Sequence, residues 1–220
     1  MDVDEALYTT RAMRRVSSDP VPMDVQARIL DAAIRAPSGG NSQNWRFLLV
    51  DDPDVIAQIG PLYREALGQL WVTFYADQLA EARANPDTEE SKEMLRVQRS
   101  AQWLADHFED VPLFLFAFVQ ADPSGSSIFP AVWSAQLAAR AHGVGSALTV
   151  VMSYLCPDPV LEILGVPRDE QWLMSCCVSF GYPLGRWGIA KRRPVHEVSF
   201  RNSWGESVGF RIDEPLWPGS

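Results

Sequence analysis

The stretch RAPSGGNSQNWRFLLV, residues 35–50, joins a predicted helix to a predicted buried strand. Pro37 ends the helix because its ring prevents helical continuation. The apolar run over 45–50 is typical of a strand that is covered on both faces. An ordinary polar turn explains Pro-Ser-Gly-Gly, but it does not explain why Asn41 and Gln43 follow at once. We therefore expect Ser38, Asn41 and Gln43 to offer hydroxyl and amide groups to a polyol or a heterocycle.

The length and composition of the chain indicate a globular protein. Its 220 residues and 24.6 kDa suit one sizeable domain, and 47% hydrophobic with 21% charged residues are typical of a folded one. The longest apolar runs, such as 112–119, hold about eight residues, far fewer than the roughly 20 needed to cross a bilayer. The N-terminus is acidic and lacks the order of a signal peptide. We expect a soluble, cytoplasmic protein without a membrane partner.

Charge, cysteines and histidines exclude several other classes. The net charge of −9 disfavours nucleic acids and anionic membranes as partners. Cys156, Cys176 and Cys177 show no metal-ligand spacing, and we interpret them as structural. The three histidines lie far apart and form no metal motif. No GxGxxG, Walker A or GxSxG motif is present either, so any chemistry is expected to belong to a bound cofactor.

Hydrophobic periodicity predicts a single α+β domain over residues 1–220, with roughly four strands covered by helices. The predicted helices are 3–15, 24–36, one or two over 52–71, 130–142 and 157–165, and the predicted strands are 45–50, 112–119, 146–152 and 171–183. Residues 76–100 are polar and are expected to form a variable lid. The tail from 184 lacks periodicity but carries Trp187, Trp204 and Trp217. We expect this arm, above all 199–220, to wrap a partner subunit.

Two basic clusters stand out in this acidic chain. Arg11, Arg14 and Arg15 are spaced i, i+3 and i+4, which predicts one face of the first helix. The run 191–193 holds a lysine and two arginines near the other end of the chain. Each cluster alone is consistent with a solvated cationic surface. The alternative is that the two clusters converge on one phosphate, whose oxygens match arginine geometry.

Four ordered motifs resemble the FMN-dependent nitroreductase family. They are TTRAMRR (9–15), APSGGNSQNWRF (36–47), FPAVWSAQLAARAHGVGS (129–146) and AKRRPVHEV (190–198). The second is similar to the family signature Ala-Pro-Ser-x-x-Asn-x-Gln-Pro-Trp-x-Phe, and the fourth is similar to its late basic-basic-x-Pro stretch. The resemblance covers about residues 5–198. It implies a nitroreductase-like fold: a mostly antiparallel central sheet flanked by helices, in a homodimer with an FMN site at each interface.

The resemblance also implies roles for particular residues. Arg11 and Arg14, with Ala12 and Met13 between them, would hold the FMN phosphate, joined by Arg192 and Arg193 from the tail. Contacts to the ribityl chain and ring would come from the other subunit, through Pro37, Ser38, Gly39 and Asn41. A backbone N–H of Thr149, Val150 or Val151 would face flavin N5. No residue of the chain is expected to be catalytic in itself, because the flavin carries the chemistry.

This chain departs from the family pattern at three places. Asn44 stands where the signature has proline, and Ala12 replaces a common serine, which leaves only its backbone for the phosphate. Val150 and Val151 replace a more polar pair, which changes the expected surroundings of N5. The lid over 76–100 matches no pattern, so it carries no information on the substrate.

The resulting hypothesis is an FMN-dependent oxidoreductase that takes hydride from NAD(P)H in a ping-pong cycle. Its acceptor would be a small nitroaromatic, quinone or activated alkene. One alternative is a family branch with other flavin chemistry, reductive dehalogenation or flavin fragmentation. A second alternative is an FMN-binding protein without turnover.

Overall fold

The computed structural model describes residues 1–217. Its helices are α1 (Val3–Thr9), α2 (Met23–Ala33), α3 (Pro53–Thr73), α4 (Ala76–Ala84), α5 (Glu89–Asp106), α6 (Ile128–Ala141), α7 (Val151–Leu155) and α8 (Pro157–Ile163). Its strands are β1 (Trp45–Val50), β2 (Leu113–Val119), β3 (Gly145–Thr149) and β4 (Leu173–Gly181). This composition confirms the α+β prediction.

The four strands form one antiparallel sheet in the order β1-β2-β4-β3. In the centre of the sheet Leu115 pairs with Leu49 of β1 on one side and with Val178 of β4 on the other. All seven residues of β2 are buried, as expected for a strand that is covered on both faces.

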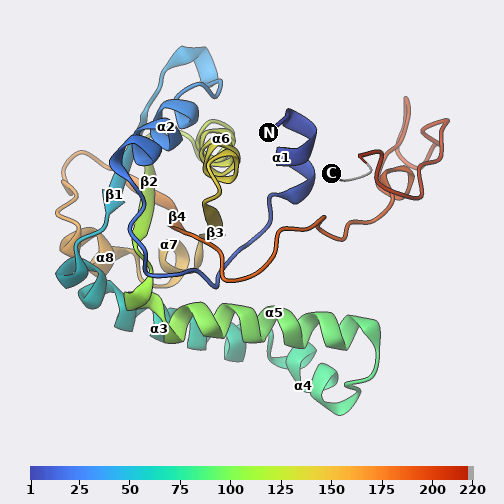
Figure 1. Cartoon of the computed structure of the whole chain (residues 1–220), viewed down its shortest axis with the longest axis horizontal. Coiled ribbons are helices and arrows are strands. Elements are labelled where there is room, and N and C mark those ends of the chain that lie inside the picture. The colour runs from blue at the N-terminus through green and yellow to red at the C-terminus, as the bar shows by residue number, and fades with distance from the viewer. Residues whose placement is uncertain (218–220) are drawn as a thin grey trace.

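The alternation of side chains along β2 supplies two cores. Leu113, Leu115 and Ala117 pack with α2 and α6 in one hydrophobic cluster. Phe114, Phe116 and Phe118 point to the opposite face, where α3, α5, α7 and α8 complete a second cluster. Figure 1 shows α2 and α6 on one side of the sheet and the long pair α3 and α5 on the other. The sheet therefore separates the two layers of helices.

The first helix is shorter than the prediction of 3–15. It ends at Thr9, and Thr10 is already extended, with φ −72° and ψ 116°. From there the chain follows the exposed edge of β3: Ala12 forms a parallel bridge with Ser146, and the Met13 N–H donates to the Ser146 carbonyl at 2.8 Å. The unpaired edge of β3 takes this segment in place of further helical turns. The prediction that the three arginines share one helix face is wrong.

The close approach of this segment depends on Gly145. A Cβ atom at Gly145 would lie 2.9 Å from the Cβ of Met13 and 2.9 Å from the Cγ of Pro183. Any larger residue would push the segment off the sheet edge, because real Cβ contacts at such distances are essentially absent. Gly145 therefore fixes where the basic residues 11–15 lie.

Several other predicted boundaries shift. Helix α2 runs over Met23–Ala33, so it begins one residue earlier and ends three residues earlier than the predicted 24–36. Strand β3 stops at Thr149, whose Oγ1 accepts from the Val151 N–H at 3.3 Å, so the predicted strand residues 151 and 152 begin α7. Helix α6 ends at Ala141, one residue before the predicted end, and Gly143 just beyond has a φ of +75°, the left-handed conformation common after helix C-termini.

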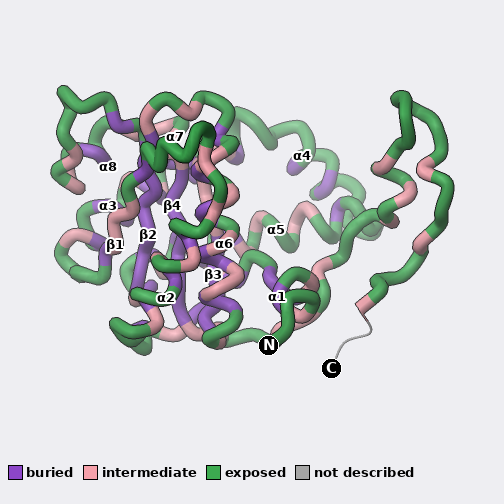
Figure 2. The backbone as a smooth tube through the Cα atoms, turned by 90° about the horizontal axis from the view of Figure 1, so that it is seen from above, coloured by how far each residue is buried: buried purple, intermediate pink, exposed green. Residues whose placement is uncertain are grey.

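The predicted polar segment 76–100 is helical. It comprises α4 and the first two-thirds of α5, and both helices extend past the end of the sheet (Figures 1 and 2). Thr88 caps α5 by accepting from the Ser91 N–H at 3.2 Å. Its role as a lid stays a prediction.

The C-terminal arm leaves the body of the chain after β4. Figure 2 shows it apart from the sheet and mostly exposed, apart from scattered half-buried positions. Trp204 is 91% exposed, and its ring lies 5.0 Å from the Phe200 ring within the arm, whereas the other two arm tryptophans contact the body of the chain. The Arg140 guanidinium lies 4.1 Å from the Trp187 ring centroid, and Trp217 lies 5.9 Å from Tyr8. That the arm wraps a partner subunit stays a prediction. Residues 218–220 of the predicted arm lie outside the described residues.

Candidate functional site

Arg14 is half-buried, whereas Arg11, Arg15, Arg192 and Arg193 are exposed. Its Nη1 donates to Ser100 Oγ of α5 at 3.4 Å, a long hydrogen bond. Burial lowers the pKa of Arg14, and the nearby Tyr63 opposes this shift. None of the ion pairs within residues 1–217 includes Arg14. A half-buried guanidinium without a carboxylate is electrostatically suited to an anion from outside the chain.

Arg11 and Arg15 have different surroundings. The Arg11 Nη2 donates to the Arg186 carbonyl at 2.7 Å, which ties the basic segment to the start of the arm. Arg15 is exposed, and its Cζ lies 6.0 Å from the Trp103 ring centroid on α5. Arg11 and Arg15 therefore leave most of their donors free for solvent or a ligand.

The second basic cluster lines a different cavity. Lys191, Arg192 and Arg193 border a space of about 800 Å³ between the arm, α1 and Trp133 of α6. Arg14 lines a smaller cavity of about 180 Å³ on the α3–α5 side of the chain. The two clusters thus do not face one cavity within a single protomer, and their meeting at one phosphate stays a prediction.

The loop over 37–43 is held in shape by its own polar groups. Ser38 Oγ accepts from the Gln43 N–H at 3.1 Å, and Gln43 Nε2 donates to Asn41 Oδ1 at 3.1 Å. Asn41 and Gln43 have φ values of 54° and 50°, a region that asparagine tolerates better than most residues. The Gly39 N–H also donates to Ser127 Oγ at 3.4 Å. Pro37 and Gly39 are exposed in the same loop, so it is preformed and open to a ligand.

The loop and the basic segment lie at opposite ends of the sheet in Figure 1. The loop follows α2, whereas residues 11–15 lie against β3 next to α5. One protomer therefore does not bring these two sets of residues to a common ligand.

The predicted flavin-facing backbone lies where β3 gives way to α7. Thr149 and Val151 line the smaller cavity together with Arg14, and Val150 stands between them as the N-cap of α7. The structure thus brings Arg14 and the 149–151 turn to one cavity, and their contacts with FMN stay a prediction.

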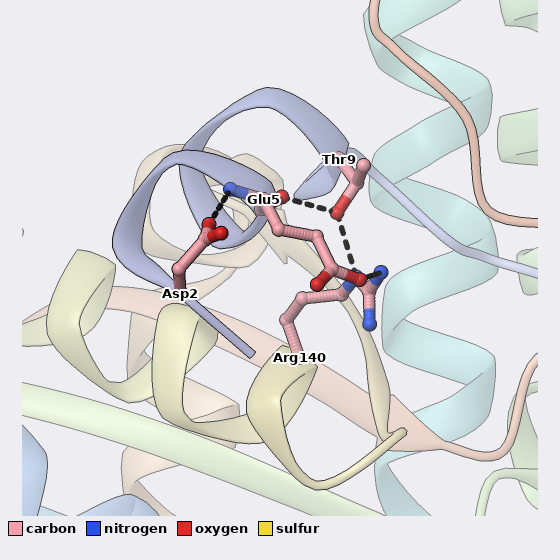
Figure 3. A network of polar contacts seen from close by, with 4 residues as sticks. All are labelled: Asp2, Glu5, Thr9 and Arg140. Carbon is pink, nitrogen blue, oxygen red and sulfur yellow. Dashed lines mark hydrogen bonds and ion pairs between the residues drawn. The ribbon is translucent and has the colours of Figure 1, made fainter. Parts of the chain in front are cut away.

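Arg140 organises a polar network that sequence reasoning missed. It is almost fully buried; its Nε donates to Thr9 Oγ1 at 2.8 Å, and its Nη2 lies 3.2 Å from Glu5 Oε1 (Figure 3). Asp2 caps the same helix by accepting from the Glu5 N–H at 2.7 Å. Arg140 thereby joins α6 to α1, immediately before the basic segment. The signal in the sequence was a lone arginine in the otherwise apolar helix 130–142.

The cysteines carry free thiols: Cys176 and Cys177 are buried and Cys156 is half-buried. Burial raises the pKa of Cys176 to about 12 and that of Cys177 well above its ordinary value, so both remain thiols. Over residues 1–217 no group of three or more His, Cys, Asp or Glu side chains could hold a metal ion. In the same range no helix is long and apolar enough to cross a membrane.

Comparison with known sequences identifies relatives along most of the chain. A sequence profile described as Nitroreductase family matches residues 7–182. A protein named NADH dehydrogenase from Thermus thermophilus is 32% identical over 205 residues, which cover 90% of this chain and 95% of that protein. Rat iodotyrosine deiodinase 1 is 25% identical over 197 residues, covering 81% of this chain. This chain spans 61% of the length of the rat protein.

Solved structures share the fold. A nitroreductase with bound FMN from Desulfitobacterium hafniense superposes with a TM-score of 0.63 at 16% identity, covering 87% of this chain and 95% of the other. Iodotyrosine deiodinase bound to FMN and 3-iodo-L-tyrosine superposes with a TM-score of 0.65 at 24% identity, covering 86% of this chain and 93% of the other. A BluB-like flavoprotein from Clostridium difficile superposes with a TM-score of 0.68 at 17% identity, covering 92% of this chain and 100% of the other. Together with a profile match over most of its length, these likenesses establish that the chain belongs to the nitroreductase family.

Proposed function

We propose that the chain is an FMN-dependent oxidoreductase that takes reducing equivalents from NAD(P)H. The observation that carries the proposal is the half-buried Arg14 guanidinium, whose only hydrogen bond within residues 1–217 is the long one to Ser100. A phosphate monoester would supply the missing counter-charge and accept several charge-assisted hydrogen bonds. The relatives support FMN as the source of that phosphate, since two of the similar structures contain it.

The chain's own residues fit the parts of FMN. Arg11 and Arg14, with the backbone of Ala12 and Met13, would bind the phosphate, and Arg192 and Arg193 would add charge from the arm. The turn over 149–151 would lie against the flavin ring with a backbone N–H toward N5. Pro37, Ser38, Gly39 and Asn41 would contact the ribityl chain and ring.

A homodimer is part of this proposal. The loop over 37–43 and the basic segment are separated within one protomer (Figure 1), so a partner subunit would have to supply one of the two. Several apolar side chains are exposed in a single protomer, and they support an interface that includes the arm. Among them are Trp133 on α6 and Leu184, Phe210 and Leu216 in the arm. Wrapping of the arm around the partner would cover them.

The chemistry follows from the cofactor and not from a side chain. Bound FMN would supply hydride transfer, and the overall reaction would convert a nitroarene, NAD(P)H and a proton into a nitrosoarene, NAD(P)⁺ and water. The chain holds the cofactor, excludes water with the apolar side chains of α3 and α5, and places the acceptor. The acceptor would be a small nitroaromatic, quinone or activated alkene, and the site of action the cytoplasm.

Reductive dehalogenation is the second candidate. It is supported by relatives named iodotyrosine deiodinase, at 24–25% identity over most of this chain. In that reaction an aryl halide and NAD(P)H give the arene, halide ion and NAD(P)⁺. The cofactor site would be the same, and only the acceptor would differ.

Steady-state oxidation of NADH and NADPH tests the proposal. Purified holoprotein should oxidise at least one of them faster when nitrobenzene or 1,4-benzoquinone is added, and chromatography should detect the reduced acceptor. Release of halide from an iodophenol in place of nitro reduction would favour the second candidate. Protein that holds FMN but oxidises neither nicotinamide with any acceptor would be a binding protein, and the proposal would be wrong.

A further inference from the structure

The start of the arm runs alongside the segment that follows α1. The Leu184 N–H donates to the Arg15 carbonyl at 3.0 Å, and the Ala190 N–H donates to the Tyr8 carbonyl at 3.4 Å. The two segments therefore pass each other in opposite directions, and we name residues 182–190 the arm root. The second basic cluster follows the arm root directly, so the position of the arm root decides where that cluster begins.

Side chains join the two segments between these hydrogen bonds. Within the described chain, no backbone hydrogen bond connects them between the Leu184 and Ala190 amides. Arg11 Nη2 donates to the Arg186 carbonyl at 2.7 Å in this interval. The other connection comes from Arg140 of α6.

Arg140 contacts both segments through different parts of its guanidinium. The edge donates to α1, from Nε to Thr9 Oγ1 at 2.8 Å and from Nη2 to Glu5 Oε1 at 3.2 Å (Figure 3). The face lies over the Trp187 ring of the arm root, with 4.1 Å between Cζ and the ring centroid. A planar cation can donate in its plane and pack a ring on its face at the same time, whereas a lysine ammonium cannot.

Burial of this arginine indicates a role in geometry. Arg140 is 6% exposed, and most other buried positions of α6 hold alanine, valine or isoleucine. A buried ion pair often stabilises a fold no more than apolar side chains of similar volume, because desolvation offsets the attraction of the charges. An apolar side chain at this position would not provide direction. The contacts of Arg140 fix α1 and the arm root relative to each other.

We propose that Arg140 is a positioning residue of the FMN site. It acts through Thr9 and Trp187: it holds α1 and the arm root in register, and so sets the separation between the basic segment 11–15 and the second basic cluster. The inference rests on the proposed function for its ligand, whereas the register concerns contacts within the chain alone.

Titrations of the full-length protein with FMN and riboflavin, followed by fluorescence quenching, test the proposal. Arg140→Leu should weaken FMN about tenfold, the value of roughly one charge-assisted hydrogen bond to the phosphate, and riboflavin less than about twofold. The matched control is Val132→Ala, which removes two methyl groups from a fully buried position of the same helix. It should lose stability and keep the wild-type preference for FMN over riboflavin. Equal losses for both flavins in Arg140→Leu, no loss for either, or an FMN-selective loss in the control would overturn the proposal.

Two further variants test whether the effect passes through the arm root. Arg140→Lys keeps the positive charge but cannot make the edge and face contacts together, so its FMN affinity should lie between those of wild type and Arg140→Leu. Trp187→Leu should also weaken FMN selectively. Both side chains act through one contact, so the double variant should bind FMN no more weakly than Arg140→Leu alone. Additive losses would show that Arg140 and Trp187 act independently, which contradicts the proposal.

Hydrogen exchange of the flavin-free, full-length protein tests the register without FMN. In Arg140→Leu the Leu184 and Ala190 amides should exchange about fivefold faster than in wild type, relative to the Leu115 amide in β2, which reports global unfolding. Val132→Ala should leave this ratio unchanged. An unchanged ratio in Arg140→Leu would overturn the proposal. Wild type that binds no FMN would instead refute the proposed function, and the exchange ratio would still decide whether Arg140 holds the arm root.

Discussion

Arg14 on the segment after α1 lies against Ser100 on α5, with 3.4 Å between Nη1 and Oγ. This contact joins two parts of the chain that the sequence keeps 86 residues apart. One is the basic segment 11–15, which is predicted to bind the phosphate, and the other is the end of the polar segment 76–100. An anion that draws the Arg14 guanidinium toward itself would therefore also act on α5.

Removal of the phosphate ligands should weaken FMN selectively. A charge-assisted hydrogen bond contributes on the order of 1.5–3 kcal/mol, which is roughly 10- to 150-fold in affinity. Arg11→Ala and Arg14→Ala should each weaken FMN at least tenfold and barely affect riboflavin, which lacks the phosphate. Fluorescence quenching measures both ligands.

Arg15→Ala is the matched control, because Arg15 is exposed and is the one arginine of the segment without an assigned phosphate contact. Its effect on FMN should be smaller. If Arg11→Ala weakens riboflavin as much as FMN, Arg11 supports the fold and does not bind the phosphate.

The Arg140 network should contribute to stability. Arg140→Leu removes the bonds to Thr9 and Glu5 and leaves Glu5 without its partner. Because the guanidinium is buried and Glu5 is partly exposed, we expect a loss of about 2–3 kcal/mol in the free energy of unfolding, below the 3–5 kcal/mol of a fully buried pair. Urea denaturation measures it.

Arg35→Leu is the surface control for this measurement. Arg35 pairs with Asp31 within α2, and both side chains are about two-thirds exposed, so its loss should cost under about 0.5 kcal/mol. Equal losses of unfolding free energy in the two variants would show that the Arg140–Glu5 pair stabilises the fold no more than a surface ion pair does.

Asp122 should make stability depend on pH. Its carboxylate accepts from the backbone N–H groups of Ser126, Ser127 and Ile128 at 2.9–3.1 Å. Partial burial acts to raise the pKa of Asp122, but these hydrogen bonds outweigh it and lower the pKa. Stabilisation by a carboxylate with a lowered pKa is fully present above the unfolded value, about 3.9, and is lost as the pH falls through the folded value.

Asp122→Ala should therefore cost about 1 kcal/mol at pH 7, the usual cost of removing a cap. The difference from wild type should shrink below about pH 4, as followed by urea unfolding at a series of pH values. Ser124→Ala is the control, because its hydroxyl makes only a 3.5 Å contact with Asp122. A constant difference down to pH 3 would contradict the account.

Local patterns were enough to predict the four strands, but long-range contacts decided how they pair and where several elements end. Strand β2 is a continuous apolar run and was predicted within one residue. Residues 10–15 have helical spacing, yet they pair with β3, because Ser146 accepts the Met13 N–H and Gly145 leaves space for it. The contributions of Ser146 and Gly145 cannot be predicted from the sequence of residues 10–15 alone.

The candidate site was predictable only through motifs. Arg14 and the 149–151 turn do meet, although more than 130 residues separate them. The partners of Arg140 and the unsatisfied N–H of Trp71 depend on side-chain packing. A tryptophan in an amphipathic helix is ordinarily part of the core, and no pattern distinguishes one whose nitrogen lacks a partner.

The arm should be needed for assembly and for FMN. Sedimentation should give about 49 kDa, twice the 24.6 kDa of one chain. Truncation after residue 198 should weaken both the dimer and FMN binding, because the exposed apolar arm residues Phe200, Phe210 and Leu216 would be lost. A monomer that keeps one FMN per chain would refute the shared site.

The absorbance spectrum of the purified protein tests the central claim, bound FMN, most directly. The account predicts a yellow protein that releases FMN and not FAD on acid treatment, and whose flavin absorbance bleaches when NADH or NADPH is added without oxygen. A colourless protein that takes up no FMN on reconstitution would contradict the account.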